Sequence, residues 1–353
     1  MSSAAIPRTP TITWLLDEGA QSAAAGILLG EVCNRLVAEG LPIASAIMSV
    51  ASLDPMVAAS RLRWRRSDGR VVAELQFHGT SGLDEQLAEQ VARDSTNAQS
   101  VSWSIADGAE LDTKQREYLD DVCLAMKAPL QAVVERETTR ALLRAYLGRR
   151  SAERVLSGTV RRGTGETIDA VIWLSDLRDF TRFSETHVLE QVIAALDDCC
   201  SHLVGAIQPF GGEVLKFIGD GLLAIFPLAG ADAKAACRAA LAATRAARQG
   251  MARLDESRIG SDLRRLPFGV ALHVGAVMYG NIGAPDRLDF TAIGPAVNTT
   301  SRIQELCRTL DCPVLISREF AARCEEALTP VGYHILRGVG EPAGLFTIRE
   351  LRP

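Results

Sequence analysis

Two acidic residues stand where predicted strands end, and their surroundings suit metal chemistry. Asp176 follows the apolar run 170–175 and precedes residues 177–181, which read as a turn into a helix. Asp220 lies between two apolar runs and beside glycines, as at the tip of a β-hairpin. Either acid alone could be a helix cap or a turn residue. If the two tips meet, their oxygens would form a site for Mg²⁺, the hard cation that handles nucleotide phosphates.

Other polar groups could handle the rest of a nucleotide. The backbone amides of Phe180 and Thr181 would be free at the predicted helix start, where phosphate oxygens bind well. Lys216 is predicted on the strand face shared with Val214 and Ile218, and its ammonium could donate a hydrogen bond to a ring nitrogen of a base. A lysine among apolar neighbours could instead protect an edge strand from pairing.

Asn298 and Arg302 are four residues apart in a predicted helix, so they share a face. An asparagine can orient a ribose, and an arginine can neutralise charge that develops on a phosphate. The alternative is that both side chains only solvate the outer face of an amphipathic helix.

The elements that must position these residues fall into two groups. The N-terminal group is predicted as a helix over 12–40, strands over 43–52, 61–64, 71–78 and 100–105, and a long helix from about residue 112 that is interrupted at Pro129. The second group is predicted as strand 168–175, helix 184–208, strands 213–218 and 222–227, helix 231–250, strands 267–275, 277–281 and 288–293, helix 295–309, strand 313–316, helix 317–326, and strands 333–336 and 345–350. Its core order, β-α-β-β-α-β, predicts an α+β fold with a ferredoxin-like palm.

Length and composition set the broad class. A chain of 353 residues with 47% hydrophobic and 23% charged residues suggests two globular domains. The net charge of −5 argues against a nucleic-acid partner. No apolar stretch is long enough for a membrane span, and the N-terminus lacks the pattern of a signal peptide. The eight cysteines show no metal-ligand spacing, so we expect reduced thiols in a cytoplasmic protein.

Three segments together resemble the class III nucleotidyl cyclases. They are 171–181 (VIWLSDLRDFT), 211–226 (GGEVLKFIGDGLLAIF) and 280–302, which contains GNIG and DFTAIGPAVN ahead of Arg302. The resemblance covers about 166–353, and the three motifs occur in the family's order and spacing. It implies a cyclase catalytic domain on the palm fold.

The resemblance assigns roles to the acidic tips and to the base-reading pair. Asp176 and Asp220 match the metal-binding aspartates, which hold two Mg²⁺ ions that Mn²⁺ can replace. Lys216 and Thr291 match the pair that selects the purine. Lysine with threonine resembles adenylyl cyclases, whereas guanylyl cyclases tend to carry Glu and Cys at these positions.

The resemblance also implies that the active site is shared between two chains. Asn298 matches the residue that orients the ribose, Arg302 matches the transition-state arginine, and Arg337 matches a basic residue that contacts the triphosphate in some members. One chain gives the metal aspartates, and its partner gives the lysine, threonine, asparagine and arginine. This sequence has every role but a single catalytic domain, so it is expected to form a head-to-tail homodimer.

Some positions depart from the family pattern. Asp179 stands where Gly is commoner, Pro295 where Asp is commoner, and the polar stretch 299–301 replaces apolar and small residues. No catalytic role is lost, but Asp179 and Pro295 could weaken triphosphate binding or lower the rate.

The N-terminal region carries no comparable motif. Residues 1–111 loosely resemble the GAF-like sensor domains found ahead of some bacterial cyclases, which implies regulation by an unidentified small molecule or protein. The predicted domains are therefore a GAF-like regulatory or sensor domain (1–111), a helical linker (112–165) whose long helix is expected to pair with its twin in a dimer, and a class III cyclase catalytic domain (166–353).

The sequence favours an adenylyl cyclase that converts ATP to cyclic AMP and pyrophosphate. The alternatives are a nucleotide-binding regulatory domain with little turnover, motivated by the departures at Asp179 and Pro295, and a guanylyl cyclase, which Lys216 disfavours.

Overall fold

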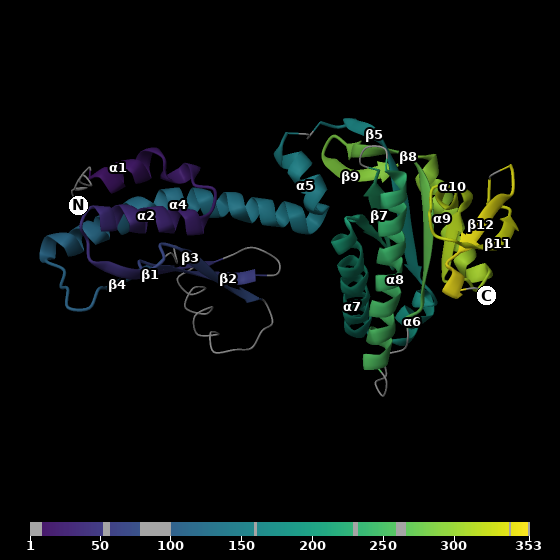
Figure 1. The fold of residues 1–353 in the computed structure, drawn as a ribbon, viewed down its shortest axis with the longest axis horizontal. Helices are drawn as coiled ribbons and strands as arrows, with labels where there is room; N and C mark the ends of the chain where they lie inside the picture. The colour runs from purple at the N-terminus through teal and green to yellow at the C-terminus, as the bar shows by residue number, and fades with distance from the viewer. Residues whose placement is uncertain are drawn as a thin grey trace. The chain divides into compact units, whose positions relative to one another are not determined.

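The computed structural model describes residues 9–51, 57–77, 100–158, 161–228, 232–258, 266–338 and 340–351. The chain divides into two compact units, Met1–Tyr146 and Leu147–Pro353 (Figure 1). None of the helices in the described ranges is both long and apolar enough to cross a membrane.

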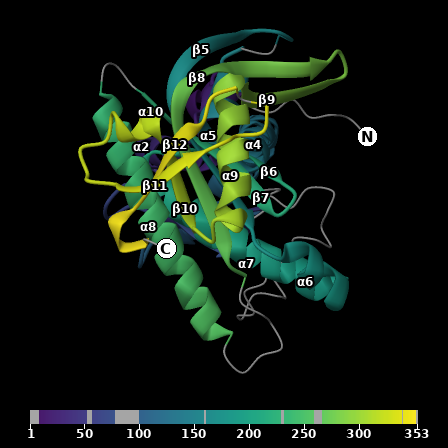
Figure 2. The same cartoon turned by 90° about the vertical axis from the view of Figure 1, so that its right-hand side faces the viewer.

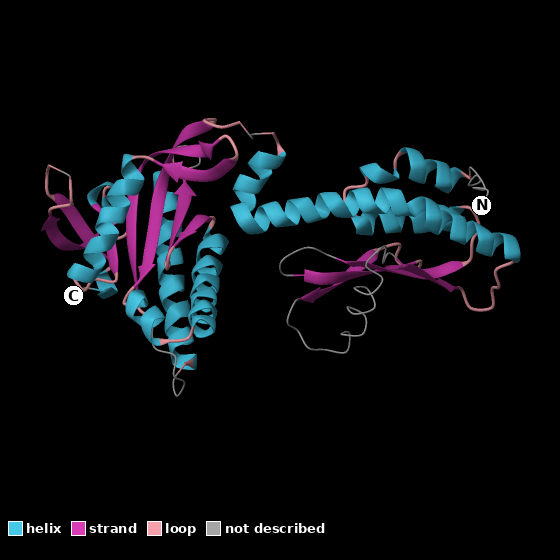
Figure 3. Ribbon diagram, turned by 180° about the vertical axis from the view of Figure 1, so that it is seen from behind, coloured by secondary structure: helices cyan, strands magenta, loops and turns pink. Residues whose placement is uncertain are grey.

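The N-terminal unit is a four-stranded antiparallel sheet with helices on one face (Figures 1 and 3). Its elements are α1 (Pro10–Asp17), the 3₁₀ turn η1 (Gly19–Gln21), α2 (Ala25–Ala38), β1 (Ile43–Ala51), β2 (Val57–Arg65), β3 (Val71–Phe77), β4 (Ser100–Ile105) and α4 (Thr113–Leu147). The strands lie in the order β3-β2-β1-β4. This α+β arrangement is compatible with the expected sensor, and its GAF-like nature stays a prediction.

Two helix predictions in this unit were wrong. The single helix expected over 12–40 is divided into α1, η1 and α2. The long helix α4 is not interrupted at Pro129 but continues through it for 35 residues. Its apolar side packs into the core through residues that include Met126, Leu130 and Val133. This burial outweighs the roughly 3 kcal/mol that a proline costs inside a helix.

The C-terminal unit is built on an eight-stranded sheet. Its elements are α5 (Arg149–Leu156), β5 (Gly165–Leu177), α6 (Phe180–Thr186), α7 (Leu189–Ile207), η2 (Gln208–Phe210), β6 (Glu213–Ile218), β7 (Gly221–Pro227), α8 (Ala233–Ser257), β8 (Phe268–Ala284), β9 (Arg287–Ile293), α9 (Pro295–Thr309), β10 (Val314–Ser317), α10 (Arg318–Ala321), β11 (Thr329–His334), β12 (Ala343–Thr347) and η3 (Arg349–Leu351). The strands follow the order β11-β12-β10-β8-β5-β7-β6, and β9 pairs with β8 off this path. The segment β8-β5-β7-β6, formed by a βαββαβ unit, confirms the ferredoxin-like palm.

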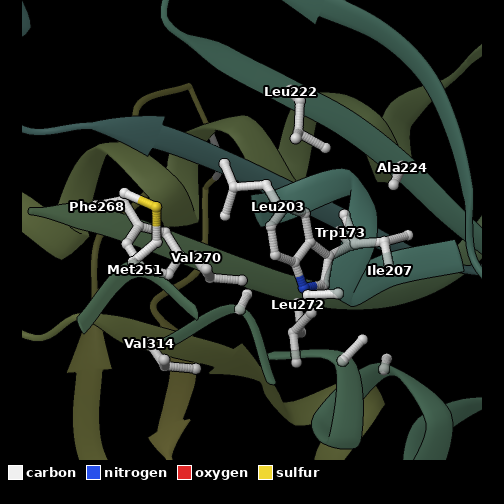
Figure 4. Packing of buried hydrophobic residues seen from close by; sticks show 14 of the residues in the cluster. Trp173, Leu203, Ile207, Leu222, Ala224, Met251, Phe268, Val270, Leu272 and Val314 are labelled. Carbon is white, nitrogen blue, oxygen red and sulfur yellow. The ribbon is translucent and has the colours of Figure 1, made fainter. Parts of the chain in front are cut away.

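Helices cover both faces of this sheet. Alternate residues of β5 point to opposite sides, so Trp173 packs under α7 and α8 while Ile172 belongs to the core on the side of α9. Figure 4 shows Trp173 beside Leu203, Ile207 and Leu272, and its indole nitrogen donates a hydrogen bond to Thr244 Oγ1 at 3.0 Å. Figure 2 shows α9 in front of the sheet, running alongside its strands.

The β8–β9 hairpin departs from the prediction. The two strands expected at 267–275 and 277–281 are one continuous strand, β8, which pairs with β5 along residues 268–280 and then with β9. β9 also contacts β6, although β5 and β7 separate β8 from β6 in the sheet. The hairpin therefore bends across the sheet, and this bend brings residues of β9 to Lys216.

Candidate active site

The structure brings the two predicted metal-binding carboxylates together. Asp176 lies near the end of β5, and Asp220 lies in the turn between β6 and β7. Burial raises the pKa of Asp176 to about 6, and the charge and hydrogen bonding of the neighbouring Asp220 carboxyl add to this rise. The pair is therefore a concentration of negative charge at one corner of the sheet, half-buried and made only of oxygen donors.

A glycine permits this approach. A Cβ atom at position 221 would lie 2.3 Å from the carbonyl oxygen of Ser175 and 3.1 Å from Asp176 Oδ1. Only glycine lets β7 begin this close to β5. The Gly-Asp-Gly turn read from the sequence is thus the reason that the second carboxylate reaches the first.

The start of α6 follows directly after Asp176 and its neighbours. Asp179 precedes the helix in a left-handed conformation with φ of 59°, and its side chain makes no capping hydrogen bond. This backbone shape favours glycine, which explains the commoner Gly of the family pattern. Phe180 packs its ring against the core, so only its backbone amide and that of the exposed Thr181 are candidates for binding phosphate.

Lys216 is held by a residue that the sequence analysis missed. Its ammonium donates to Asp289 Oδ2 at 2.5 Å, and both side chains are partly exposed. The prediction that Lys216 shares a face with Val214 was wrong. The pairing of β6 with β7 shifts register between Val214 and Lys216, so Val214 packs under α7 and α8 while Lys216 turns toward β9. The signal available in the sequence was that Asp289 precedes Thr291 by two residues in one strand, so that both share a face.

Thr291 is buried, and its hydroxyl lacks a hydrogen-bond partner within the described part of the chain. The residue is 2% exposed. Buried hydroxyls are nearly always paired, so an orphan on the strand that holds the partner of Lys216 is a candidate for substrate recognition.

The three remaining predicted residues line one cavity. Asn298 and Arg302 project from the same face of α9, and Arg337 joins them from the loop after β11. The cavity measures about 450 Å³, and Ser301, Glu305 and Gly338 complete its lining. Within the described residues, Arg302 makes no ion pair, so its charge is available to an anion.

Asp176 opens into a different cavity. This second cavity measures about 280 Å³ and is lined by residues 176–179 together with Gln304, Glu305, Cys307 and Arg308 of α9. The two cavities share Glu305, but neither contains Lys216 or Thr291. One chain thus presents the carboxylates of Asp176 and Asp220, the predicted base-reading residues Lys216 and Thr291, and the cavity of Arg302 in separate places.

No cluster of three or more metal-binding side chains occurs in the described ranges. The departure Pro295 is the first residue of α9, where a missing N–H breaks no helical hydrogen bond. All eight cysteines lie in the described residues and are buried or half-buried, and their reduced state stays a prediction.

Comparisons with known proteins point to a cyclase catalytic domain in the C-terminal unit. A family model described as "Adenylate and Guanylate cyclase catalytic domain" matches residues 165–336. An "Adenylate cyclase" of Anabaena cylindrica is 31% identical over 159 residues, which is 44% of this chain and 30% of the relative. An uncharacterized protein of Mycobacterium tuberculosis (strain H37Rv) is 30% identical over 247 residues, which is 68% of this chain and 42% of the relative. The chain thus spans less than half the length of these curated relatives.

One solved structure supports the fold across most of the chain. A bacterial light-regulated adenylyl cyclase superposes with a TM-score of 0.56 and 18% identity, and the match covers 88% of this chain and 95% of the other. At this identity the similarity concerns the fold alone.

Proposed function

Because residues 165–336 form a catalytic domain of the class III nucleotidyl cyclase family, we propose that this protein is an adenylyl cyclase that converts ATP to 3′,5′-cyclic AMP and pyrophosphate. The observation that carries this proposal is the carboxylate pair of Asp176 and Asp220, placed beside the start of α6. In the reaction the ribose 3′-oxygen forms a bond to the α-phosphorus, the bond from that phosphorus to pyrophosphate breaks, and the 3′-hydroxyl loses its proton.

The carboxylate pair fits Mg²⁺, with Mn²⁺ as a substitute. Two oxygen-donor side chains are what Mg²⁺ commonly takes from a protein when substrate phosphates supply further ligands. Burial, and after it the neighbouring Asp220, raises the pKa of Asp176, and a bound cation would stabilise its ionised form. Bound there, the metal would neutralise phosphate charge and acidify the 3′-hydroxyl.

Lys216 and Thr291 are proposed to read adenine. The Lys216 ammonium can donate to a ring nitrogen, and the unpaired Thr291 hydroxyl can accept from the exocyclic amine of the base. Asp289 holds the lysine and so limits the directions in which its ammonium can point. Guanine offers a carbonyl oxygen in place of that amine.

Asn298 and Arg302 are proposed to act at the ribose and at the phosphates. Their shared cavity places an amide beside a guanidinium that can neutralise charge on the transferring phosphoryl group. Arg337 would add a contact to the triphosphate from the cavity rim.

We propose that two copies of the chain complete each site. The three groups of side chains open in different places on one copy, whereas a single nucleotide must touch all of them. Large apolar side chains also stand exposed next to the purine-reading pair, namely Phe217 (54%), Ile218 (51%) and Ile293 (46%). A second copy that covers this surface would bury them and could supply the missing groups.

Two alternative functions predict different products from those of the adenylyl cyclase. A domain that binds nucleotide with little turnover is favoured by one observation, the charged and left-handed Asp179 at the α6 start. A guanylyl cyclase is disfavoured by Lys216, because its ammonium can donate to N1 of adenine, whereas N1 of guanine carries a hydrogen and is itself a donor.

A single assay separates the three proposals. The purified chain is incubated with ATP or GTP in parallel, with Mg²⁺ or Mn²⁺, and cyclic nucleotide and pyrophosphate are measured. We expect cyclic AMP and an equal amount of pyrophosphate from ATP. Binding without product supports the regulatory alternative, and cyclic GMP from GTP as the main product supports the guanylyl cyclase.

The N-terminal unit is proposed to regulate the cyclase from within the same polypeptide. It contains a cavity of about 700 Å³ between α2, α4 and the sheet, lined mainly by apolar and small residues. The identity of the regulator is left open, as it is in the sequence.

A further inference from the structure

A buried carboxylate at the start of β6 joins three elements of the C-terminal unit. One oxygen of Glu213 accepts hydrogen bonds from the Ser151 backbone N–H (3.1 Å), the Ser151 hydroxyl (2.9 Å) and the Tyr279 hydroxyl (2.8 Å). Ser151 and Tyr279 are fully buried, and Glu213 is 9% exposed. Because a buried carboxylate is unfavourable unless it is hydrogen-bonded, α5, β6 and β8 are held together at this point.

The surroundings keep this network intact. Burial raises the pKa of Tyr279, so its hydroxyl remains a donor at neutral pH. The guanidinium groups of Arg150 and Arg154 lie 5.9 and 5.3 Å from the centroid of the Tyr279 ring and bring positive charge to the region of the carboxylate.

The network bridges two strands that are not neighbours in the sheet. β6 and β8 are separated by β7 and β5, and the bent β8–β9 hairpin brings β9 into contact with β6. A second bridge, the Lys216–Asp289 ion pair, lies three residues after Glu213 on β6. On the hairpin, Asp289 stands opposite Ile282, which lies three residues after Tyr279. The Glu213–Tyr279 and Lys216–Asp289 contacts are therefore spaced by the same number of residues along β6 and along β8. The first contact is buried, and the second faces the proposed purine site.

The ring of Tyr279 also reaches the strand of Thr291. It meets the ring of Phe290 edge-on, with 4.9 Å between centroids and an interplanar angle of 85°. Phe290 lies between Asp289 and Thr291 in β9. A shift of Tyr279 would therefore move Asp289, the partner of Lys216, together with Thr291.

We propose that Glu213 and Tyr279 are positioning residues for purine recognition. Their hydrogen bond fastens the bent hairpin to β6 and so fixes the spacing between Lys216 and Thr291. Neither residue touches the base, and Ser151 makes α5 part of the same assembly. This inference rests on the proposed function, because it takes Lys216 and Thr291 as the residues that read the purine.

The test removes one hydroxyl at a time from the full-length chain. Tyr279→Phe keeps the ring and its contact with Phe290 but deletes one donor to Glu213, and Ser151→Ala deletes another. We expect ATP to bind about 3–10-fold more weakly, the range of one ordinary hydrogen bond, and its preference over GTP to fall similarly. The turnover at saturating ATP should stay within about twofold, because the reacting groups are untouched.

Thr244→Val is the matched control. It also deletes a buried hydroxyl hydrogen bond in the same unit, the one from Trp173, on the face that α8 covers. A merely structural role predicts that all three variants lower the thermal stability and leave the ATP-to-GTP preference unchanged. That result, or an equal change of preference in Thr244→Val, overturns the proposal.

Binding is measured with fluorescent ATP and GTP labelled on the 3′-oxygen, which lack the reacting hydroxyl, so the test does not depend on turnover. If Tyr279→Phe fails to fold, Ser151→Ala decides the outcome by itself. A wild-type chain that binds neither nucleotide overturns the proposed function together with this inference. A wild-type chain that makes cyclic AMP, with variants of unchanged preference, overturns this inference alone.

Discussion

Single side chains decide what the corner of the sheet can bind. Asp176 and Asp220 meet because Gly221 lets β7 start against the Ser175 carbonyl. Lys216 and Asp289 meet because β6 shifts its register just before the lysine. In both cases a small local feature of the backbone sets which functional groups become neighbours.

Replacing Asp176 by Asn should have opposite effects on activity and on metal-free stability. We expect cyclase activity to fall about 100-fold or more through loss of a metal ligand. The folded pKa of Asp176, about 6, lies above its ordinary value of 3.8, so its stabilising contribution is present below pH 3.8 and is lost as the pH rises through about 6. With EDTA present, the melting temperature of the wild type should thus fall more between pH 5 and pH 7 than that of Asp176→Asn.

The control for this comparison is Asp286→Asn, which removes an exposed carboxylate from the β8–β9 turn. Mg²⁺ should raise the melting temperature of the wild type and of Asp286→Asn but not of Asp176→Asn. An equal response of all three proteins to Mg²⁺ would show that the metal binds elsewhere.

The purine preference should depend on three residues rather than two. Lys216→Glu with Thr291→Cys should lower the use of ATP at least about 10-fold and admit some GTP. The new carboxylate would face Asp289, which now lies 2.5 Å from the Lys216 ammonium, so like charges would repel. Adding Asp289→Asn should therefore improve the use of GTP. Values of kcat/KM for both nucleotides measure the effect, and an unchanged ATP preference in the double variant would contradict the base assignment.

Among the helices and strands, those bounded by glycine or proline were predicted best from the sequence. Strand 213–218 and helix 295–309 agree with β6 and α9 at both ends; Gly-Asp-Gly marks the end of the strand, and Gly-Pro marks the start of the helix. Local sequence signals did not predict that α4 continues through Pro129 or that β8 continues through residue 276. Both depend on packing against segments distant in the sequence, which no local pattern records.

The same limit applies to the candidate site. The meeting of Asp176 with Asp220 and the shared face of Asn298 and Arg302 could be inferred from motifs, but the contact of Lys216 with Asp289 could not. It requires the hairpin to bend across the sheet, and the alternation of residues along β6 pointed the lysine to the wrong face.

Asp179, which stands where the family commonly has Gly, shapes the start of helix α6. Asp179→Gly should relieve the left-handed backbone and remove negative charge where the triphosphate is proposed to bind. We expect the KM for ATP to fall about 2–5-fold, because one like charge near an anion costs up to about 1 kcal/mol at a solvent-exposed position. Asp179→Asn separates the causes, since asparagine tolerates the same φ without the charge. If only the glycine variant responds, the backbone and not the charge limits binding.

Each active site is proposed to draw on two copies of the chain. Asp176→Ala and Arg302→Ala should each be nearly inactive alone. Mixed after co-expression, they should recover up to about a quarter of wild-type activity, because half of randomly paired dimers are mixed and each mixed dimer has one intact site of two. Size-exclusion chromatography with two different tags verifies that mixed dimers form. Mixed dimers without recovered activity would refute the shared site.

The pairing of β5 with β8 has a consequence for how the chain acquires its shape. Gly165 pairs with Gly280, and Leu177 pairs with Phe268, so the middle of the sheet joins segments separated by more of the chain than any hairpin in it. During synthesis β5 can dock on β7 early, but its other edge has no native partner until the ribosome has released β8. Such distant pairing slows folding and leaves an open strand edge that other nascent chains can reach.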